Sequence, residues 1–489
     1  MGQALHILRK DARYLRGEIV LVLALVALLG YTAAPTAEIL ALLAMNYLIA
    51  RVIHAEPIPG YNQFWITRPY RWQSLFGSKV LFVLLFLDLP LLAAQIYAIV
   101  AHDFSLSSSL AGLLWSQALY ITCLFLPVMC LASLTSGLIP FLVTEFIVVA
   151  EVLIAEGVVY GHFSWSQFLP GAKPGPQAMD WVRDFIVMAI VVAFAAIVLY
   201  SQYRTRNSEK GRKTAVAGVA AAGAVFLLLP WPVMMSVQAA ISRESFNAAS
   251  LKVDLASVKY SVFSGMGPRK GPAPPERICL PLRLNGVPAN REVAFDSISV
   301  RLEASDGRSW SSGVVAPIPV ESGENIVDAS LPVDPAFLMM ERARPLTARA
   351  KIYLTLFGDP HSATIPLGSG PPVNTVDGLQ CSEGLLDQLA CRSIFRWPGK
   401  RVYAGTRGGV QSYVRDFSYS PFPAELGFNP VEQHSFSTGL ASKEAVITTK
   451  APLSHFHVDV TLDGVVPDDY TAAAKTRAMQ TPSSRITWN

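Results

Sequence analysis

The chain has 489 residues, of which 52% are hydrophobic and only 16% are charged, and its mean hydropathy is +0.37. Soluble domains carry charges at roughly a quarter of their positions, so this composition excludes an ordinary soluble protein and indicates an integral membrane protein. The net charge of +4 is too small to favour nucleic-acid binding. Long apolar runs end near Ala240, so the two halves of the chain are expected to face different solvents.

Residues 1–17 are predicted to form an amphipathic helix that lies on the inner membrane surface. Leu5, Leu8, Ala12 and Leu15 recur at helical spacing, and basic residues surround the other face. A second apolar run follows in place of a cleavage site and soluble sequence. The basic start therefore predicts retention in the membrane.

Basic residues of the first half gather in three groups. These groups are Arg9, Lys10, Arg13 and Arg16; Arg51, Arg68, Arg71 and Lys79; and Arg204, Arg206, Lys210, Arg212 and Lys213. Cytoplasmic segments of membrane proteins are rich in Lys and Arg, so all three groups are expected on the cytoplasmic side.

Seven apolar runs approach the roughly 20 residues that a helix needs to cross about 30 Å of hydrocarbon. They are residues 17–35, 37–54, 79–101, 110–133, 138–159, 182–201 and 214–236. Two separate crossings by the first two runs keep all basic groups on one side. We therefore predict a helical membrane domain of about seven spans over residues 18–240. The N-terminus would lie in the cytoplasm, and the part of the chain after the last span would lie outside it.

The second basic group overlaps a stretch that is both basic and aromatic, residues 61–79. Aromatic rings favour the membrane interface, and Lys and Arg favour its cytoplasmic side. This mixture predicts a cytoplasmic interfacial helix ahead of the third span.

Ionisable residues inside spans are candidates for function, because burial of a charge in hydrocarbon is costly. Asp88 lies near the middle of a span beside Pro90, which removes a backbone donor and favours a kink. Glu145 and Glu156 share one face of the fifth span. The alternative is that the glutamates lie near span ends or, as neutral groups, bond to neighbouring helices. Asp88 would either line a path, pair helices or have no special role.

After about Leu251 the pattern has a period of two, which is typical of half-buried strands. Turn signals such as Asp306–Gly307 and Asp463–Gly464 separate the runs. We predict an all-β, sandwich-like extracytoplasmic domain at residues 245–370 and a second β-rich unit at residues 371–489.

Cys381 and Cys391 are ten positions apart in this exported half, so they are candidates for a disulfide. Such a bond would stabilise the fold by about 3 kcal/mol in the chain-entropy model. The alternative is that these cysteines and Cys279 are free buried thiols, since the sequence does not supply the geometry.

His455 and His457 alternate onto one face of a predicted strand and are weak candidates for metal ligands. A metal site needs a third ligand, and His434 is a guess from sequence. The simpler hypothesis places both histidines on the solvent face of the strand and Phe456 in the core. No metal is therefore assigned, although a metal-dependent outer enzyme is kept as a third function.

The sequence contains no GxxxxGK[ST] phosphate loop, no GxGxxG after a strand, no HExxH and no GxSxG. We expect that this chain is not an enzyme and that it binds no cofactor. Any active transport would then take its energy from a partner or a gradient.

Three features of the first half resemble a known family. An interfacial helix at 3–17 leads into the first span, FWITRPYRWQSLFGSKVLF follows at the second cytoplasmic turn, and SLTSGLIP at 133–140 separates the fourth and fifth spans. With the outer segment between spans five and six, these features resemble the permease subunit of an ABC-2 type transporter over about residues 1–210. The nearly absent first outer loop, the seventh span and the strand-rich tail depart from that family.

The resemblance implies that residues 61–79 are a coupling element against which a separate ATPase dimer pushes. Its candidates are Thr67, Arg68, Pro69, Arg71 and Trp72. Thr67 would cap the helix and Pro69 would fit its first turn. Trp72, Leu75 and Phe76 would lie toward the membrane, and the arginines would be available to acidic residues or lipid phosphates. The alternative is that this composition only anchors the helix and fixes topology.

The resemblance further implies a permease in the bacterial cytoplasmic (inner) membrane that acts as a homodimer or heterodimer among membrane lipids. ATP would bind in the partner ABC-type ATPase, and the outer domain would receive the substrate, an envelope protein or a polysaccharide. The alternative from another class is a membrane-anchored extracytoplasmic binding or assembly protein without transport activity.

Overall fold

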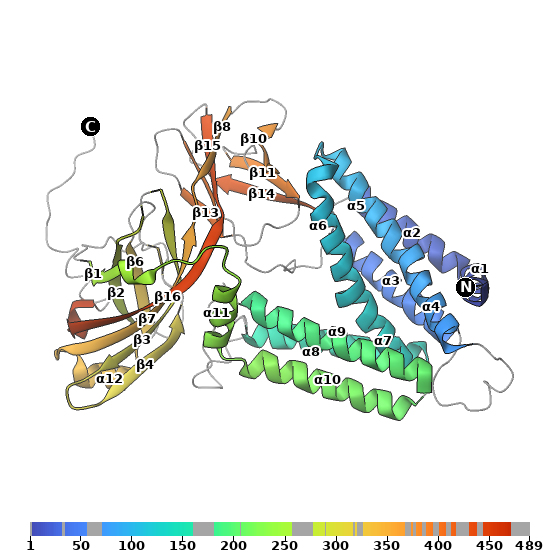
Figure 1. Ribbon diagram of the computed structural model, residues 1–489, viewed down its shortest axis with the longest axis horizontal. Helices are drawn as coiled ribbons and strands as arrows, with labels where there is room; N and C mark the ends of the chain where they lie inside the picture. Colours follow the sequence, from blue (N-terminus) through green and yellow to red (C-terminus); the bar gives the residue numbers. More distant parts are fainter. Residues whose placement is uncertain are drawn as a thin grey trace, which may run out of the picture.

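The computed structural model contains helices in the first half of the chain and strands in the second, as the sequence predicts (Figure 1). The helices lie side by side in an elongated bundle, and the strands gather beyond one end of it. The described residues are 2–31, 35–55, 71–159, 180–205, 207–256, 277–288, 290–315, 318–319, 326–366, 373–374, 378–383, 388–394, 401–406, 412–416, 430–437 and 444–470.

The helical half begins with a short helix that lies across the end of the bundle. The helices are α1 (Gly2–Tyr14), α2 (Arg16–Tyr31), α3 (Pro35–His54), α4 (Trp72–Val83), η2 (Leu84–Asp88), α5 (Leu89–Ala101), α6 (Leu106–Leu119), η3 (Tyr120–Phe125), α7 (Leu126–Leu134), α8 (Leu138–Val159), α9 (Asp180–Thr205), α10 (Ser208–Leu228) and α11 (Trp231–Ala240). The elements η2 and η3 are π-helical turns that continue their neighbours into single long helices.

Five of the described helices are long and apolar enough to cross a membrane. They are Thr36–His54, Trp72–Ala101, Ser109–Leu134, Val182–Thr205 and Ser208–Leu228. The pair α1 and α2, bent by 80°, makes a sixth if it counts as one span, and the apolar part described for α8, Leu138–Ala150, is shorter. The described residues therefore hold five or six candidate spans where the sequence predicted seven, and they indicate a membrane-embedded protein.

Helix α1 is amphipathic, and its buried face agrees in part with the predicted one. Leu15, just after the helix, is buried and Leu8 and Ala12 pack against the core, but Leu5 is 55% exposed and the fully buried residues of the helix are Ile7 and Asp11. The prediction counted only apolar residues at helical spacing, and it missed that a carboxylate lies at the centre of the buried face. The reason is tertiary: Lys79 of α4 reaches this carboxylate.

The segment before the third span is not a separate helix up to residue 79, where the structure describes it. Helix α4 begins at Trp72 and continues through η2 and α5 to Ala101. Lys79, at which the interfacial helix was predicted to end, is 1% exposed within this helix. A paired cation does not require the helix to leave an apolar environment, which explains why the predicted boundary was wrong.

The last predicted span, 214–236, is shifted and divided. Helix α10 starts at Ser208, where the Asn207 side chain accepts a hydrogen bond from the Lys210 N–H at 2.9 Å. It ends at Leu228, and α11 begins after Pro230. The residue before a proline is biased toward extended backbone, and Leu229 has ψ 113°. Proline chemistry therefore separates a crossing helix from the short helix that leads to the strands.

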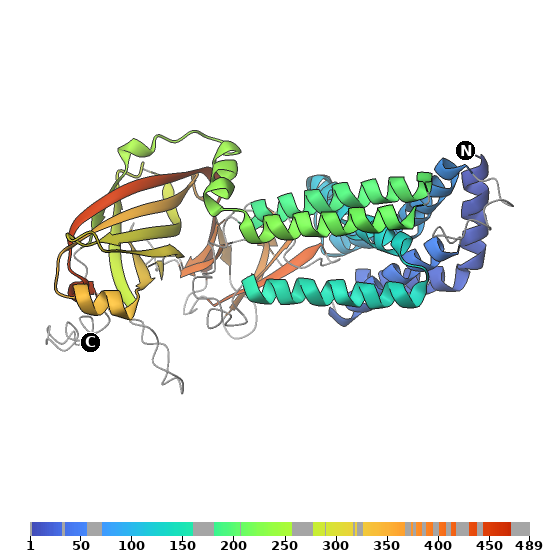
Figure 2. The same ribbon diagram turned by 90° about the horizontal axis from the view of Figure 1, so that it is seen from below.

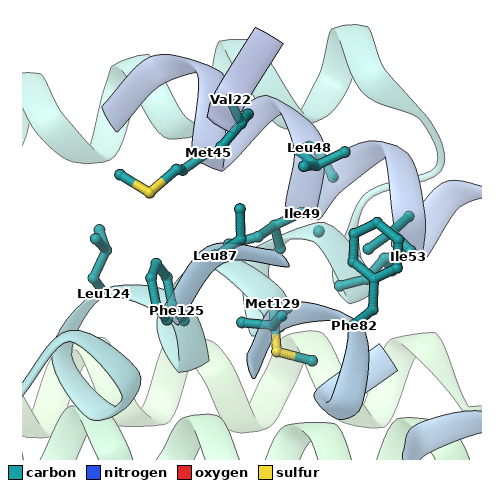
Figure 3. Close-up of a cluster of buried hydrophobic side chains, with 14 of the residues drawn as sticks. Val22, Met45, Leu48, Ile49, Ile53, Phe82, Leu87, Leu124, Phe125 and Met129 are labelled. Atoms are coloured by element: carbon teal, nitrogen blue, oxygen red, sulfur yellow. The ribbon is translucent and has the colours of Figure 1, made fainter. Parts of the chain in front are cut away.

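The helices share one apolar core (Figure 3). Buried side chains of α2, α3, α4, η2, η3 and α7 meet there; among them are Val22, Met45, Leu48, Ile49, Ile53, Phe82, Leu87, Leu124, Phe125 and Met129. Four other helical segments thus pack around the two π-helical turns, and packing of this kind fixes the positions of the turns within the bundle.

The described residues of the second half form four separate four-stranded sheets. The strands are β1 (Lys252–Leu255), β2 (Arg277–Asn285), β3 (Glu292–Glu303), β4 (Ser309–Val315), β5 (Ile318–Pro319), β6 (Ile326–Pro332), β7 (Leu346–Phe357), β8 (His361–Pro366), β9 (Val373–Asn374), β10 (Gln380–Glu383), β11 (Gln388–Ile394), β12 (Arg401–Thr406), β13 (Ser412–Asp416), β14 (Val431–Ser437), β15 (Glu444–Lys450) and β16 (Pro452–Val465). A short helix, α12 (Pro335–Glu341), precedes β7. The strand orders are β1-β2-β6-β5, β16-β7-β3-β4, β13-β12-β15-β8 and β14-β11-β10-β9.

The strand pairings cross the division that was expected near residue 370. Strand β16 pairs with β7, so that His455 lies opposite Thr355. Strand β8 pairs with β15. The first two sheets share one apolar core, to which β16 also contributes. The chain therefore leaves this core after β7, builds the other two sheets and returns to it in its last strand.

Candidate coupling site at the charged end of the helices

One end of the helical bundle, opposite the strands, carries most of the ion pairs of the helical half. We call it the charged end; it comprises α1, the first turns of α2, α4 and α10, and the last turns of α3, α7 and α9. Helix α1 lies across it at the extreme of the molecule (Figure 2). The segment 56–70, which contains most of the predicted coupling element, connects two of these turns and lies outside the described residues.

Asp11 and Lys79 form a buried ion pair between α1 and α4. The Lys79 Nζ–H donates to Asp11 Oδ2 at 2.7 Å, and both side chains are 1% exposed. Removal of two charges from water is costly unless they meet in good geometry, so this pair specifies one seating of α1. From the sequence, Lys79 was expected among the cations of the cytoplasmic side, and Asp11 was not selected. Its position between Ile7 and Leu15, at spacings of four, was the signal that could have found it.

A second pair ties α2 to α3 at the same end. Arg51 Nη2 lies 3.3 Å from Glu18 Oε1, and the Arg51 guanidinium lies 5.8 Å from the centre of the Tyr14 ring. Both side chains of the ion pair are partly exposed. Partly exposed pairs contribute less than buried ones, so Arg51 orients the junction of α1 and α2 more than it stabilises it.

The last carbonyl groups of α7 are capped by side chains from two other helices. His54 Nε2 lies 2.9 Å from the Ala132 carbonyl oxygen, and Arg212 donates to the Leu134 carbonyl oxygen at 3.2 Å. The final carbonyls of a helix have no partner within the helix and carry its negative dipole end. The break at 135–137 is therefore held by α3 and α10. His54 was not selected from the sequence, and Arg212 was selected only as one of the cations expected on the cytoplasmic side.

The start of α4 packs on α9 through aromatic rings. Trp72 meets Tyr200 edge to face at 5.6 Å, and Phe76 lies 5.1 Å from Tyr203. Leu75 is 2% exposed in the core. The expectation that Trp72, Leu75 and Phe76 lie toward the membrane was therefore wrong, because a neighbouring helix covers that face of α4.

The predicted cap of this helix is also wrong. The residue before α4 is Arg71, which is exposed and whose side chain makes no capping hydrogen bond. A cap supplied by Thr67 would require the helix to begin several residues earlier. Thr67, Arg68 and Pro69 themselves lie outside the described residues.

The intramembrane candidates lie in different places. Glu145 of α8 accepts a hydrogen bond at 2.5 Å from Asn46 Nδ2 of α3. Asp88 is the last residue of the turn η2. The Glu156 side chain lies outside the described residues, so the shared face of the two glutamates stays a prediction. Glu145 thus has the helix-pairing geometry that was one of the alternatives.

Sequence reasoning missed a polar network near the strand end of the bundle. Gln95 Oε1 accepts from Gln117 Nε2 at 2.7 Å and from the Ser116 hydroxyl at 3.3 Å, while Gln95 Nε2 donates to the Tyr120 hydroxyl at 3.1 Å. Such hydrogen bonds join helices within a membrane. Uncharged amides in apolar runs give little signal in a search for ionisable groups.

The cysteine pair of the strand-rich half is bonded in the structure. Cys381 and Cys391 are directly opposite each other on β10 and β11, both are buried, and their sulfur atoms form a disulfide. Antiparallel neighbours at this register bring the two Cβ atoms close, which is geometry that the spacing of ten residues did not reveal.

The two candidate histidines have separate surroundings. His455 is half-buried, with Nδ1 3.1 Å from Gln238 Nε2 and 2.8 Å from Thr355 Oγ1, so the hypothesis of a solvent face is wrong for this residue. His457 is 48% exposed. His434 belongs to another sheet, the one containing β14. Among the described residues no three His, Cys, Asp or Glu side chains form a metal-binding group.

Helix α11 covers His455 and joins the two halves of the chain. Met234 and Met235 pack with Val182 of α9 and Tyr353 of β7 in a small buried cluster. Gln238 is 1% exposed, and the His455 N–H donates to the Ser242 hydroxyl at 3.0 Å. The strand-rich half is thus attached to the start of the same helix, α9, whose other end lies at the charged end.

No family model, no curated protein and no solved structure matches this chain.

Proposed function

We propose that this chain is the membrane subunit of an ABC-2-like transporter that works with a separate ATPase to export or handle an envelope substrate. The observation that carries the proposal is the buried Asp11–Lys79 pair at the charged end. It fastens the crosswise helix α1 to the helix that immediately follows the basic and aromatic segment 61–71. A force applied to that segment would then move α1 and α4 as one unit.

The contacts of α4 suggest how such a movement would travel. Its first turns pack on Tyr200 and Tyr203 of α9. Helix α9 has 26 residues and is therefore about 39 Å long. Its start contacts α11 and β7 through Val182. A displacement at the charged end would thus reach the strand-rich half along one continuous helix.

The charged end would lie in the cytoplasm of a bacterium and the strands outside its inner membrane. This orientation follows from the bias of Lys and Arg toward cytoplasmic segments. The outer half, as one or two sandwich-like units, would receive the substrate or an envelope partner. Two permease copies, identical or related, would serve one ATPase dimer.

The test is copurification from membranes with a tagged chain. An ATP-hydrolysing subunit should be recovered with the wild type, and reversal of both arginines (R68E with R71E) should release it. The matched control is K213E, because Lys213 is an exposed cation at the same end, 76% exposed, outside the coupling segment. Retention after R68E with R71E would contradict the coupling role, and release by K213E as well would reduce it to general charge attraction.

A second function is favoured by the independence of the strand-rich half, which has its own apolar cores and a disulfide. The chain would then be a membrane-anchored extracytoplasmic binding or assembly protein whose helices only hold it in place. In that case no ATPase copurifies, and substitutions at the charged end leave the binding of envelope components unchanged.

A further inference from the structure

The two π-helical turns of the bundle have closely similar sequences. Each turn ends two residues before a proline. The end of η2 lies in Phe86-Leu87-Asp88-Leu89-Pro90, and the end of η3 lies in Cys123-Leu124-Phe125-Leu126-Pro127. In both, the residue before the proline donates its N–H five residues back, from Leu89 to the Leu84 carbonyl and from Leu126 to the Ile121 carbonyl. The two turns are thus equivalent in backbone, and Asp88 occupies the position of Phe125.

This equivalence shows that the carboxyl group is not needed to build the turn. Pro90 and Pro127 lack an N–H and conflict with the preceding turn of an α-helix, which is sufficient reason for the wider π geometry. Phe125 is 1% exposed in the core, so an apolar residue fills the second turn. Asp88 therefore adds a group that the architecture does not require.

The turn around Asp88 also contains an acceptor without a helical donor. The α-helical donor of the Leu85 carbonyl would be the Leu89 N–H, which bonds to Leu84 instead. In a π-helix the donor to the Leu85 carbonyl would be residue 90, but this residue is a proline and has no N–H. Asp88 follows Leu85 by three residues, and helical side chains point back toward that preceding turn. The carboxyl and this carbonyl therefore belong to the same turn.

Asp88 is itself incompletely bonded. Its Oδ1 is buried and has no hydrogen-bond partner among the described residues. An ionised carboxylate in the same turn as a carbonyl group that lacks a helical donor places further unpaired acceptors in apolar surroundings, and this is costly. A protonated carboxyl supplies the missing donor. The chemistry of the turn favours one additional proton.

We propose that η2 is a proton-binding site, at which the Asp88 carboxyl carries a proton while the turn is shielded and releases it when the turn opens to water. Protonation would close the turn by supplying an O–H donor, and ionisation would favour a hydrated, open turn. The helix α4–α5 that contains the site begins at the charged end, so opening there and at the turn can be linked. The site does not depend on the transport proposal, since it concerns one carboxyl group in the isolated chain.

The test is labelling of the full-length protein in phospholipid vesicles with an apolar carbodiimide, which adds to protonated carboxyl groups. Peptide mass mapping would follow the adduct at Asp88 between about pH 5 and about pH 9. Labelling should fall at least tenfold as the pH rises, while Glu209, 79% exposed, should stay unlabelled. Absence of labelling at low pH, or labelling independent of pH, would overturn the proposal.

A sodium arm separates a proton from a metal cation. At constant pH, replacement of choline chloride by sodium chloride should leave the labelling of Asp88 unchanged. Protection by sodium would show a cation site and would overturn the assignment to a proton.

Two variants separate a binding group from a structural one. D88N removes the acid with little change in shape, and D88F copies the sister turn. Both should lose labelling at position 88 and keep the thermal unfolding midpoint at or above that of the wild type. A lowered midpoint in both would mean that the carboxyl holds the fold together, and the proposal would fail.

Discussion

The Asp11–Lys79 pair is the charge interaction of the charged end that water reaches least. Each partner alone would be a buried charge without compensation, which costs far more than the net contribution of the intact pair. The pair therefore specifies where α1 sits on α4. Removal of one partner should lower the free energy of unfolding more than removal of both.

We predict that K79M destabilises the protein by about 3–5 kcal/mol, because the buried Asp11 loses its hydrogen-bonded counter-charge and keeps only the longer, 3.8 Å contact with the partly exposed Lys10. Adding D11L to K79M should recover most of this loss, since both charges are then absent. Thermal unfolding in detergent would measure the free energies. The control is K213M, which removes an exposed pair with Glu209 and should cost at most about 0.5 kcal/mol. Equal losses for K79M and K213M would contradict the buried pair.

His455 gives the strand-rich half a pH dependence with a definite sign. Burial lowers the pKa of His455 to about 4 from its ordinary value of 6.5. Thr355, which contacts the imidazole ring, donates a hydrogen bond to the carboxylate of Asp296 at 2.5 Å. Between the two pKa values the unfolded chain binds more protons than the folded one.

We therefore predict that the free energy of unfolding increases by up to about 3 kcal/mol as the pH rises from about 4 to about 6.5. The same stability is lost when the pH falls through this range. H455Q should flatten this dependence. H457Q is the matched control, because His457 on the same strand is 48% exposed. Denaturation monitored by protease sensitivity of the strand-rich half would measure both. An unchanged slope in H455Q would show that the dependence comes from other groups.

At the scale of elements, prolines decide where the long helices change. Pro90 and Pro127 are accommodated inside helices by π-helical turns, whereas Pro230 ends α10. The difference lies in the packing: the first two lie in helices whose neighbouring turns are buried in the core, and the end of α10 is exposed at Leu227 and Leu228. Packing compensates for a lost backbone donor only where helices surround it.

Strands β10 and β11 are joined by a disulfide and contribute to a small apolar core. We predict that replacement of Cys381 and Cys391 by Ser lowers the free energy of unfolding by about 3 kcal/mol, because a ten-residue loop is released in the unfolded state. Denaturant unfolding with and without reductant would test this. C279S, which removes a free cysteine, should leave the response to reductant unchanged. Equal stability with and without the bond would contradict the prediction.

At the scale of the molecule, the two ends differ in their chemistry. Ion pairs and most cations of the helices lie at the charged end, and the disulfide lies among the strands beyond the other end. Disulfides persist in oxidising compartments, which fits the strands outside the cytoplasm. One continuous helix, α9, connects the two ends.

We predict opposite accessibility at the two ends in intact spheroplasts. A membrane-impermeant thiol reagent should label D306C, since Asp306 lies in a turn with its side chain 42% exposed, without permeabilisation. It should label K213C only after permeabilisation. Mass spectrometry would measure both adducts. Labelling of K213C in intact spheroplasts, or protection of D306C, would reverse the orientation.

Local patterns were enough to predict the class of the molecule and much of its order. Apolar runs of span length predicted membrane helices, alternation predicted strands, and the glycine turns were correct at Gly307 and Gly464, which have φ of 87° and 75°. These features depend on neighbours within a few residues, so the sequence by itself determines them.

Tertiary contacts decided the rest. The burial of Lys79 depends on Asp11, 68 residues away, and the seating of His455 depends on Gln238 of a distant helix. The return of β16 to β7 likewise joins residues about one hundred positions apart. A sequence pattern indicates which residues could be buried. The partner that offsets the cost of burying a charge or an imidazole lies elsewhere in the chain. For that reason the membrane class could be predicted from sequence, whereas the charged end and the joint of α11 required the three-dimensional structure.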